Sequence, residues 1–352
     1  MAGVGVTSWT PATQVEWLAL TTEEPLEPDL PIVDAQHHMY FSTDRTDRRA
    51  EHPAHYMVEE LAADVNSGHL IVATVYVESG AMYRAFGPDH LKYTGETEFA
   101  QGVAAIGEAG VLGHCRMVAG IIGSGDPSCT RDQLAELISI HHNSSRNFRG
   151  LRFCGGAPER IPWRSPELRS ALQLMSDHSY VLDVNGPESF PIDFHSVLGD
   201  VDEIACSFPD LTIVLEHCGG FVGPTAFQGE DGSEALLAWK LWIGSLARRP
   251  NVHVKIGGLV MPQNGFDLEV RAHPVGSREL AGLLLPFVGH VLDCFGADRC
   301  MFESNFPMAK SGVSYNILWN AFKRLAGRKG LTASEKEAVF ARTAARVYRI
   351  PI

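Results

Sequence analysis

The stretch PIVDAQHHMYF, residues 31–41, holds two adjacent histidines at the end of an apolar run. Successive side chains of a β-strand point to opposite faces, so we expect Asp34, Gln36 and His38 on one face. His37 would then point to the other face. A metal-binding strand end would carry two imidazoles on one face in the spacing His-x-His. Because Gln36 stands in the first of these places, the stretch is either part of a metallohydrolase or part of a relative that works without the metal.

Polar side chains also stand near the ends of the other apolar segments of the chain, most of which are rich in Val and Ile. Burying so many polar groups costs stability unless they contact one another or a ligand. Their gathering is therefore the main physical argument for a site. The residues concerned are Gln36, His38, Tyr76, Glu78, Arg152, Asp183, Glu216, His217, Lys255, Glu303 and Asn305.

Alternation and charge give further expectations for some of these side chains. Glu216 directly precedes His217, so we expect it to point away from the site, toward helix packing or a neighbouring loop. Arg152 is equally consistent with a salt bridge to Asp183 and with a separate role in the site. Lys255 is equally consistent with a site cation and with a core ion pair.

Eight short apolar segments alternate with stretches of helical periodicity, which predicts right-handed βαβ units and a parallel sheet. Helix starts are marked by Thr130, by Ser165 and by Thr332, which has Glu335 at capping-box spacing. The apolar segments lie at 30–38, 69–79, 115–126, 148–156, 179–187, 211–220, 251–259 and 299–307.

Eight such units close into a (β/α)8 TIM barrel of the α/β class, with its active site at the C-terminal ends of the strands. The polar residues lie at these ends. An open doubly wound sheet fits less well, because no G-x-G-x-x-G follows the first strand. We therefore expect a single barrel domain over residues 30–352, preceded by an N-terminal arm over residues 1–29.

Composition narrows the class of partner. The chain has 352 residues and a formal net charge of −13, which argues against a nucleic-acid backbone or an anionic membrane as partner. No apolar run approaches the roughly 20 residues that span a bilayer, and the start of the chain lacks a basic segment before an apolar one. Seven cysteines without a C-x-x-C pair fit free thiols. We expect a cytoplasmic protein that acts on a small-molecule substrate, with a homodimer left open.

Four motifs give residues 31–350 a resemblance to the amidohydrolase-2 branch of the amidohydrolase superfamily. They are IVDAQHHMY, LTIVLEHCGG, NVHVKIGGL and GADRCMFESNFP, in this order along the chain. The resemblance implies a (β/α)8 barrel. It also implies an activity within a branch that contains metal-dependent decarboxylases and hydrolases and metal-free lactonases.

The metal ligands of that branch match Gln36, His38, His217 and Asn305, so that amides stand in for one histidine and for the only carboxylate. Neutral amide oxygens are weak ligands for Zn²⁺, and we expect no metal and no other cofactor. Asn305 also takes the place of the aspartate that serves the family as a base. Glu303, which stands where the family usually has glycine, is one candidate for a substitute base, and His217 is the other.

The first hypothesis is a metal-free hydrolase of a small cyclic ester, a lactone, or a related carboxylate substrate. A lactone has a better leaving group than an amide and can react without a Lewis acid, provided that donors polarise its carbonyl and a base takes the proton of water. Arg84 and Arg152 would clamp a substrate carboxylate. The expected catalytic residues are His38, His217, Glu303 and Asn305. The expected substrate-binding residues are Gln36, Tyr76, Glu78, Arg84, Arg152, Asp183 and Lys255.

Two alternatives stay open. One keeps a divalent metal such as Zn²⁺, held by His38, His217 and Glu303, in a hydrolase or in a non-oxidative decarboxylase of an aromatic or unsaturated acid. The other is a barrel that binds a small acid without catalysis. A buried Glu303 carboxylate facing two histidines would favour an enzyme, because such a group is costly in a protein that only binds.

Overall fold

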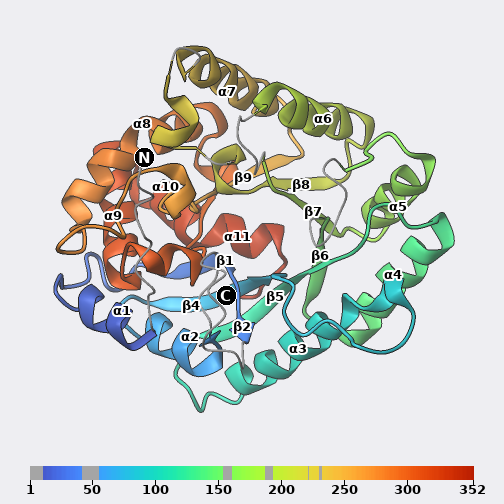
Figure 1. Cartoon of the computed structure of the whole chain (residues 1–352), viewed down its shortest axis with the longest axis horizontal. Helices are drawn as coiled ribbons and strands as arrows, with labels where there is room; N and C mark the ends of the chain where they lie inside the picture. Colours follow the sequence, from blue (N-terminus) through green and yellow to red (C-terminus); the bar gives the residue numbers. More distant parts are fainter. Residues whose placement is uncertain (1–10, 42–54, 154–160, 187–192, 221, 230–231) are drawn as a thin grey trace, which may run out of the picture.

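The computed structural model describes residues 11–41, 55–153, 161–186, 193–220, 222–229 and 232–352. Within them, eight parallel strands lie side by side in chain order and helices surround them (Figure 1). This arrangement confirms the (β/α)8 barrel expected from the sequence. The strands are β1 (Ile32–His37), β4 (Ile71–Val77), β5 (Arg116–Ser124), β6 (Phe148–Arg152), β7 (Val181–Val184), β8 (Thr212–Leu215), β9 (Val252–Ile256) and β10 (Cys300–Phe302).

The helices follow the strands as the sequence predicts. The capping box at Thr130 and Gln133 begins one helix, and Ser165 caps the next. The outer helices are α2 (Val58–Val65), α3 (Thr94–Glu108), α4 (Arg131–Ser144), α5 (Pro166–Asp177), α6 (Phe194–Ser207), α7 (Gly232–Leu246), α8 (Ser277–Phe295) and α9 (Tyr315–Arg328). A short hairpin of β2 (Tyr40–Phe41) and β3 (His55–Tyr56) stands outside the barrel sheet.

The first and last strands are joined just beyond their ends. The backbone N–H of Asn305 donates to the Gln36 carbonyl at 2.9 Å, and that of His38 donates to the Phe306 carbonyl at 2.7 Å. These two bonds complete the ring of strands. They also fix four neighbouring positions, among them three that the sequence marks as site residues.

The barrel interior is filled by small and branched side chains from alternate strand positions. Among them are Val33, Val75, Ile122, Val181 and Met301. The C-terminal segment packs against the same cluster. This segment consists of α10 (Ala333–Glu337), a π-helical turn (Ala338–Arg342) and α11 (Thr343–Val347). In Figure 1, α11 lies inside the ring of outer helices. The segment therefore closes the barrel and brings Tyr348 to its interior.

The expectation that Asp34 shares a face with Gln36 and His38 is wrong. The pairing of β1 with β4 shifts register between Asp34 and His37, and such an irregularity breaks the strict alternation of a strand. Asp34 accepts hydrogen bonds from Ser304, at 2.6 Å from the hydroxyl, and from Tyr315 of α9, at 2.9 Å. It therefore ties the strand end to the helix layer.

The described part of the N-terminal arm, which includes α1 (Pro11–Leu18), reaches α8 and α9. Glu23 accepts hydrogen bonds from the Ser277 backbone at 2.8 Å and from Asn320 at 3.1 Å. The ammonium of Lys323 donates to the Leu26 carbonyl at 2.8 Å. These contacts hold the arm on the outside of the barrel.

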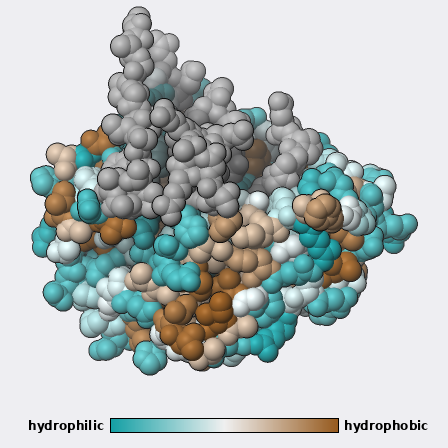
Figure 2. Space-filling view, turned by 60° about the horizontal axis from the view of Figure 1, so that its bottom comes forward, coloured by the Kyte–Doolittle hydropathy of each residue, from teal (hydrophilic) through white to brown (hydrophobic). Residues whose placement is uncertain are grey.

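The molecular surface carries both polar and apolar regions. On the face seen in Figure 2, hydrophilic side chains cover most of the area and hydrophobic side chains gather in its lower part. None of the helices in the described residues is long and apolar enough to cross a membrane.

The close approach of β6 and β7 yields a test of this packing. A Cβ atom on Gly150 would lie 1.9 Å from the carbonyl oxygen of Val181, so Gly150→Ala must push two strands apart. We expect a loss of several kcal/mol in the free energy of unfolding, measured by chemical denaturation. The matched control is Gly102→Ala in α3, where the added methyl meets nothing within 4 Å. It should stabilise the protein by about 0.5–1 kcal/mol because glycine is a poor helix residue. Equal stabilities for the two variants would contradict this account.

Candidate active site

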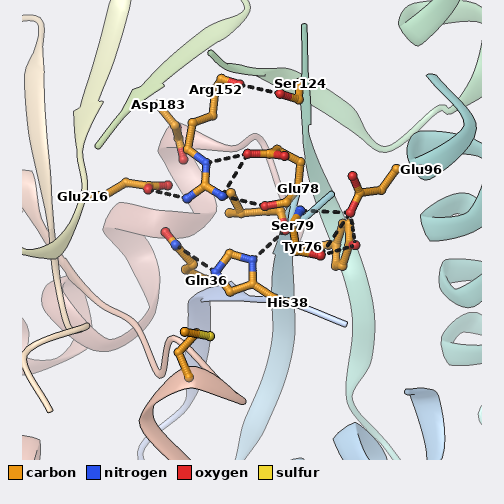
Figure 3. A network of polar contacts seen from close by, with 12 residues as sticks. Gln36, His38, Tyr76, Glu78, Ser79, Glu96, Ser124, Arg152, Asp183 and Glu216 are labelled. Carbon is orange, nitrogen blue, oxygen red and sulfur yellow. Dashed lines mark hydrogen bonds and ion pairs between the residues drawn. The ribbon is translucent and has the colours of Figure 1, made fainter. Parts of the chain in front are cut away.

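The centre of the barrel holds two cations, Arg152 and Lys255, among three carboxylates. Figure 3 shows Arg152 with Glu78, Asp183 and Glu216 around it. The Arg152 guanidinium donates to Glu78 Oε1 at 3.1 Å and to Glu216 Oε2 at 2.7 Å. The Lys255 ammonium donates to Asp183 Oδ2 at 2.6 Å and to Glu216 Oε1 at 3.2 Å. Glu216 thus bridges the two cations. The five groups are buried and carry one net negative charge when all are ionised.

The neighbouring charges decide the protonation of this cluster. Burial alone would raise the pKa of Glu216, but Arg152 and Lys255 outweigh it and hold that pKa below its ordinary value. Burial would likewise lower the pKa of Lys255, and the carboxylates of Asp183 and Glu216 raise it instead. Burial raises the pKa of Asp183 to about 6 in spite of the nearby ammonium. Both cations therefore stay charged, and each is already neutralised by the protein itself.

Lys255 also orients the amide at the end of β1. Its ammonium donates to Gln36 Oε1 at 2.8 Å, which turns the Gln36 amide nitrogen toward His38 Nε2, 3.3 Å away. On the other side of the imidazole, His38 Nδ1 donates to the Val77 carbonyl at 2.8 Å. The His38 ring is therefore fixed in the tautomer that carries its proton on Nδ1.

His38 is a neutral imidazole. Burial, reinforced by the charge of Arg152, lowers the pKa of His38 to about 3. The Oδ1 atom of Asn305 lies 3.1 Å from His38 Nε2 and its Nδ2 atom donates to Met261 Sδ at 3.3 Å. The Nε2 atom of neutral His38 accepts a hydrogen bond and cannot donate one. Rotation of the Asn305 amide by half a turn exchanges Oδ1 and Nδ2, so that Asn305 becomes the second donor to this nitrogen, beside Gln36.

A second imidazole forms a pair with a carboxylate. His217 Nδ1 lies 2.6 Å from Glu303 Oε1. Burial would lower the pKa of His217, but the charge of Glu303 and this hydrogen bond raise it above its ordinary value. The other carboxylate oxygen, Glu303 Oε2, is buried and has no hydrogen-bond partner in the described structure. Glu303 is fully buried, whereas His217 remains 7% exposed, so the imidazole is the member of the pair that can meet a ligand.

Two consecutive glycines make room for this pair. A Cβ atom on Gly257 would lie 2.2 Å from Glu303 Cγ, and one on Gly258 would lie 2.3 Å from His217 Nδ1. The glycines of NVHVKIGGL thus explain how a glutamate fits at position 303. His217 and Asn305 also have positive φ angles, 52° for each. A backbone conformation that most residues avoid is common at functional sites.

The structure corrects the expectation for Glu216, whose side chain points into the barrel. The interior position of Val214 places Glu216 on the same face by alternation. β8 ends at Leu215, and the left-handed backbone at His217 then breaks the alternation, so His217 reaches Glu303 as well. Arg152 is not paired with Asp183, because Glu78 and Glu216 take its hydrogen bonds. Lys255 is the cation that pairs with Asp183.

Two expected substrate contacts lie elsewhere. Val75 and Val77 point into the barrel, so Tyr76 between them points outward, where its hydroxyl donates to Glu96 of α3 at 2.6 Å. Arg84 forms an ion pair with Glu98 on α3 instead of joining Arg152. Arg84 and Arg152 therefore do not form the expected clamp for a substrate carboxylate.

The structure adds two residues that the sequence did not single out. The Tyr348 hydroxyl donates to Asp183 at 3.0 Å, and Lys255 lies 5.4 Å from the centre of its ring. Tyr83, from the loop after β4, donates to Glu78 at 3.2 Å. Neither residue stands at a strand end, so no spacing signal could have marked it.

Across the described residues, no group of three or more His, Cys, Asp or Glu side chains is arranged to hold a metal ion. The three residues of the metal hypothesis are not gathered around one point: His38 contacts amides, whereas His217 and Glu303 contact each other. His38 Nε2 faces two amides, and His217 Nδ1 faces Glu303.

Comparison with known proteins finds a family model and relatives that match most of the chain. A family model described as Amidohydrolase matches residues 33–350. An uncharacterized protein from Sinorhizobium fredii is 30% identical over 305 residues, which cover 84% of this chain and 86% of that protein. A protein named L-fucono-1,5-lactonase from Burkholderia multivorans is 29% identical over 241 residues, 63% of this chain and 78% of the relative.

A solved structure shares the fold. The crystal structure of an amidohydrolase from Burkholderia multivorans with bound zinc superposes with a TM-score of 0.67 at 24% sequence identity. The match covers 91% of this chain and 99% of that chain.

The pairing of His217 with Glu303 is testable by NMR titration of the histidine rings. His217 should titrate above the value of about 6.5 that is typical of an unperturbed histidine. Glu303→Gln should lower this pKa, because it removes the negative charge while keeping the size of the side chain. Glu98→Gln, an acid-to-amide change on the exposed side of α3, is the control and should leave His217 unchanged. An unaltered His217 titration in folded Glu303→Gln would refute the pairing.

Proposed function

Because the chain belongs to the amidohydrolase family, whose model matches residues 33–350, we propose that it hydrolyses a small uncharged lactone without the help of a metal. The observation that carries the proposal is the His217–Glu303 pair at 2.6 Å, set beside a neutral histidine and two amides. Together they supply a base and a group of hydrogen-bond donors.

His217 is the proposed general base. Its Nδ1 donates to Glu303, so neutral His217 presents Nε2 as an acceptor for the proton of an attacking water. The imidazolium that forms is stabilised by the hydrogen bond to the Glu303 carboxylate. The water oxygen bonds to the carbonyl carbon, the ring C–O bond then breaks, and the proton passes from His217 to the leaving alkoxide. The products are a hydroxy acid and the regenerated base.

The carbonyl oxygen of the lactone needs donors where its negative charge develops. The amide nitrogens of Gln36 and Asn305 each carry two N–H groups, and a single contact with His38 uses one of them. The Gln36 amide is held in place by Lys255 through its oxygen at 2.8 Å. A donor that is fixed before the substrate arrives loses no energy to reorganisation during the reaction.

The charge of the site favours a neutral substrate. Arg152 and Lys255 are neutralised by three carboxylates, so a substrate carboxylate would have to compete with the protein's own acids. Carboxylates accept hydrogen bonds from hydroxyl groups. A polyhydroxylated lactone fits this chemistry, and the name of the Burkholderia multivorans relative, L-fucono-1,5-lactonase, supports a sugar lactone.

The donor set does not suit a divalent metal. Amide groups replace stronger ligands at Gln36 and Asn305. The Lys255 ammonium, 2.8 Å from Gln36 Oε1, would repel a second cation at this position. The positive φ angles at His217 and Asn305 favour an enzyme over a barrel that only binds, because such strain persists where a function uses it.

The proposal is tested by hydrolysis assays on a panel of neutral sugar lactones and lactones that carry a carboxylate. We expect turnover of the neutral compounds and at least about tenfold lower kcat/KM for the anionic ones. Glu303→Gln and His217→Asn should each lower kcat by about 10²–10⁴-fold, which is typical for the loss of a general base.

The matched control for these variants is Glu59→Gln on the exposed side of α2, which should keep wild-type activity. Turnover of no lactone by the wild type would overturn the proposed reaction. Full activity in both Glu303→Gln and His217→Asn would overturn the assignment of the base.

A further inference from the structure

A buried acid lies just outside the barrel, on α3. Glu96 Oε1 accepts hydrogen bonds from the Tyr76 hydroxyl at 2.6 Å and from the backbone N–H of Ser79 at 2.9 Å. The Ser79 hydroxyl lies 3.1 Å from the same oxygen. Glu96 Oε2 is buried without a hydrogen-bond partner in the described structure. Figure 3 shows this group beside the Arg152 cluster.

Glu96 is connected to the site through residues 78 and 79, which follow β4. Ser79 follows Glu78, whose carbonyl and carboxylate both accept hydrogen bonds from Arg152, at 2.5 and 3.1 Å. The Ser79 hydroxyl also lies 2.9 Å from the Met39 carbonyl, next to His38. The end of β4 that carries Glu78 is therefore anchored to α3 by Glu96 and to the end of β1 by Ser79.

We propose that Glu96 is a positioning residue for the active site, whose neutral form holds the end of β4 in place and whose ionised form displaces Glu78 and Arg152. The proposal rests on the proposed lactone hydrolysis for its activity readout. Glu96 itself lies outside the cluster of Arg152 and Lys255 and touches no reacting atom.

The surroundings of Glu96 favour its neutral form at neutral pH. Burial first, and the charge of Glu78 second, raise the pKa of Glu96 to about 8. An ionised Oε2 buried without a partner costs far more than a neutral one. Among the described residues, other titratable or charged groups near this position already have partners. They are Tyr76, which bonds Glu96, His37 against the Tyr76 ring, His141 of α4, which bonds Thr97, and Arg84, paired with Glu98.

Loss of the proton places a negative charge on Glu96 close to the Glu78 carboxylate. Like charges at close range repel, and the repulsion is strong in a buried environment. Glu78 is the side chain that can yield, because Arg152 keeps a second partner in Glu216. The expected consequence is an alkaline loss of activity that follows the ionisation of Glu96.

The test compares pH profiles of the wild type and Glu96→Gln, an amide that accepts the same hydrogen bonds and cannot ionise. After subtraction of uncatalysed lactone hydrolysis, wild-type kcat/KM should fall about tenfold from pH 7 to pH 9, as expected for a group that titrates near 8. Glu96→Gln should match the wild type at pH 7 to within about threefold and lose less than about twofold by pH 9. Glu98→Gln, from the exposed side of the same helix, should keep the wild-type loss.

An alkaline loss of full size in Glu96→Gln would overturn the proposal, since a merely structural role predicts it. If Glu96→Gln fails to fold, Tyr76→Phe replaces it. This variant removes a hydrogen bond that lowers the pKa of Glu96, so it should move the alkaline loss to higher pH. An unmoved loss in Tyr76→Phe would also overturn the proposal.

If the wild type hydrolyses no lactone, the proposed function fails and Glu96 is tested separately by infrared spectroscopy. The carbonyl absorption of a protonated carboxyl group should disappear between pH 7 and pH 9 in the wild type and be absent from Glu96→Gln at both pH values. A wild-type spectrum without this absorption at pH 7 would overturn the assignment of Glu96 as a neutral acid.

Discussion

The buried ammonium of Lys255 is the interaction on which the rest of the site depends. It contacts Gln36 at the end of β1, Asp183 in β7 and Glu216 after β8. Removing one partner from such a buried set leaves an uncompensated charge and typically costs about 3–5 kcal/mol. Lys255 therefore does three things at once. It orients the Gln36 amide, it keeps two carboxylates ionised, and it places a fixed positive charge at the end of β1.

The closure of the barrel fixes the backbone at the site. Gln36 and Asn305 are linked by a backbone hydrogen bond of 2.9 Å, so the two amides near His38 are set by the same contact that joins the first and last strands. The absence of a Cβ atom at Gly257 admits Glu303. The same few positions thus specify both the fold and the site. A rigid barrel holds polar groups in place before the substrate arrives because its backbone contacts fix them.

The fold could be predicted from the sequence because strand and helix signals alternate regularly over the whole domain. The site could be predicted in part. Residues at strand ends, such as Lys255 and His217, were found because a barrel brings strand ends together. The partner of Arg152 was not found, because several carboxylates compete for it and only the fold decides among them. Tyr348 and Tyr83 were missed because each reaches the site from outside the strands.

The central claim is that this site works without a metal, and metal analysis combined with an activity assay tests it most directly. The protein would be purified, analysed for divalent ions, treated with a chelator, and assayed on the lactone that it hydrolyses best. The account predicts far less than one divalent ion per chain and unchanged hydrolysis after chelation. About one tightly held ion per chain, with activity that disappears on its removal and returns on its addition, would contradict the account.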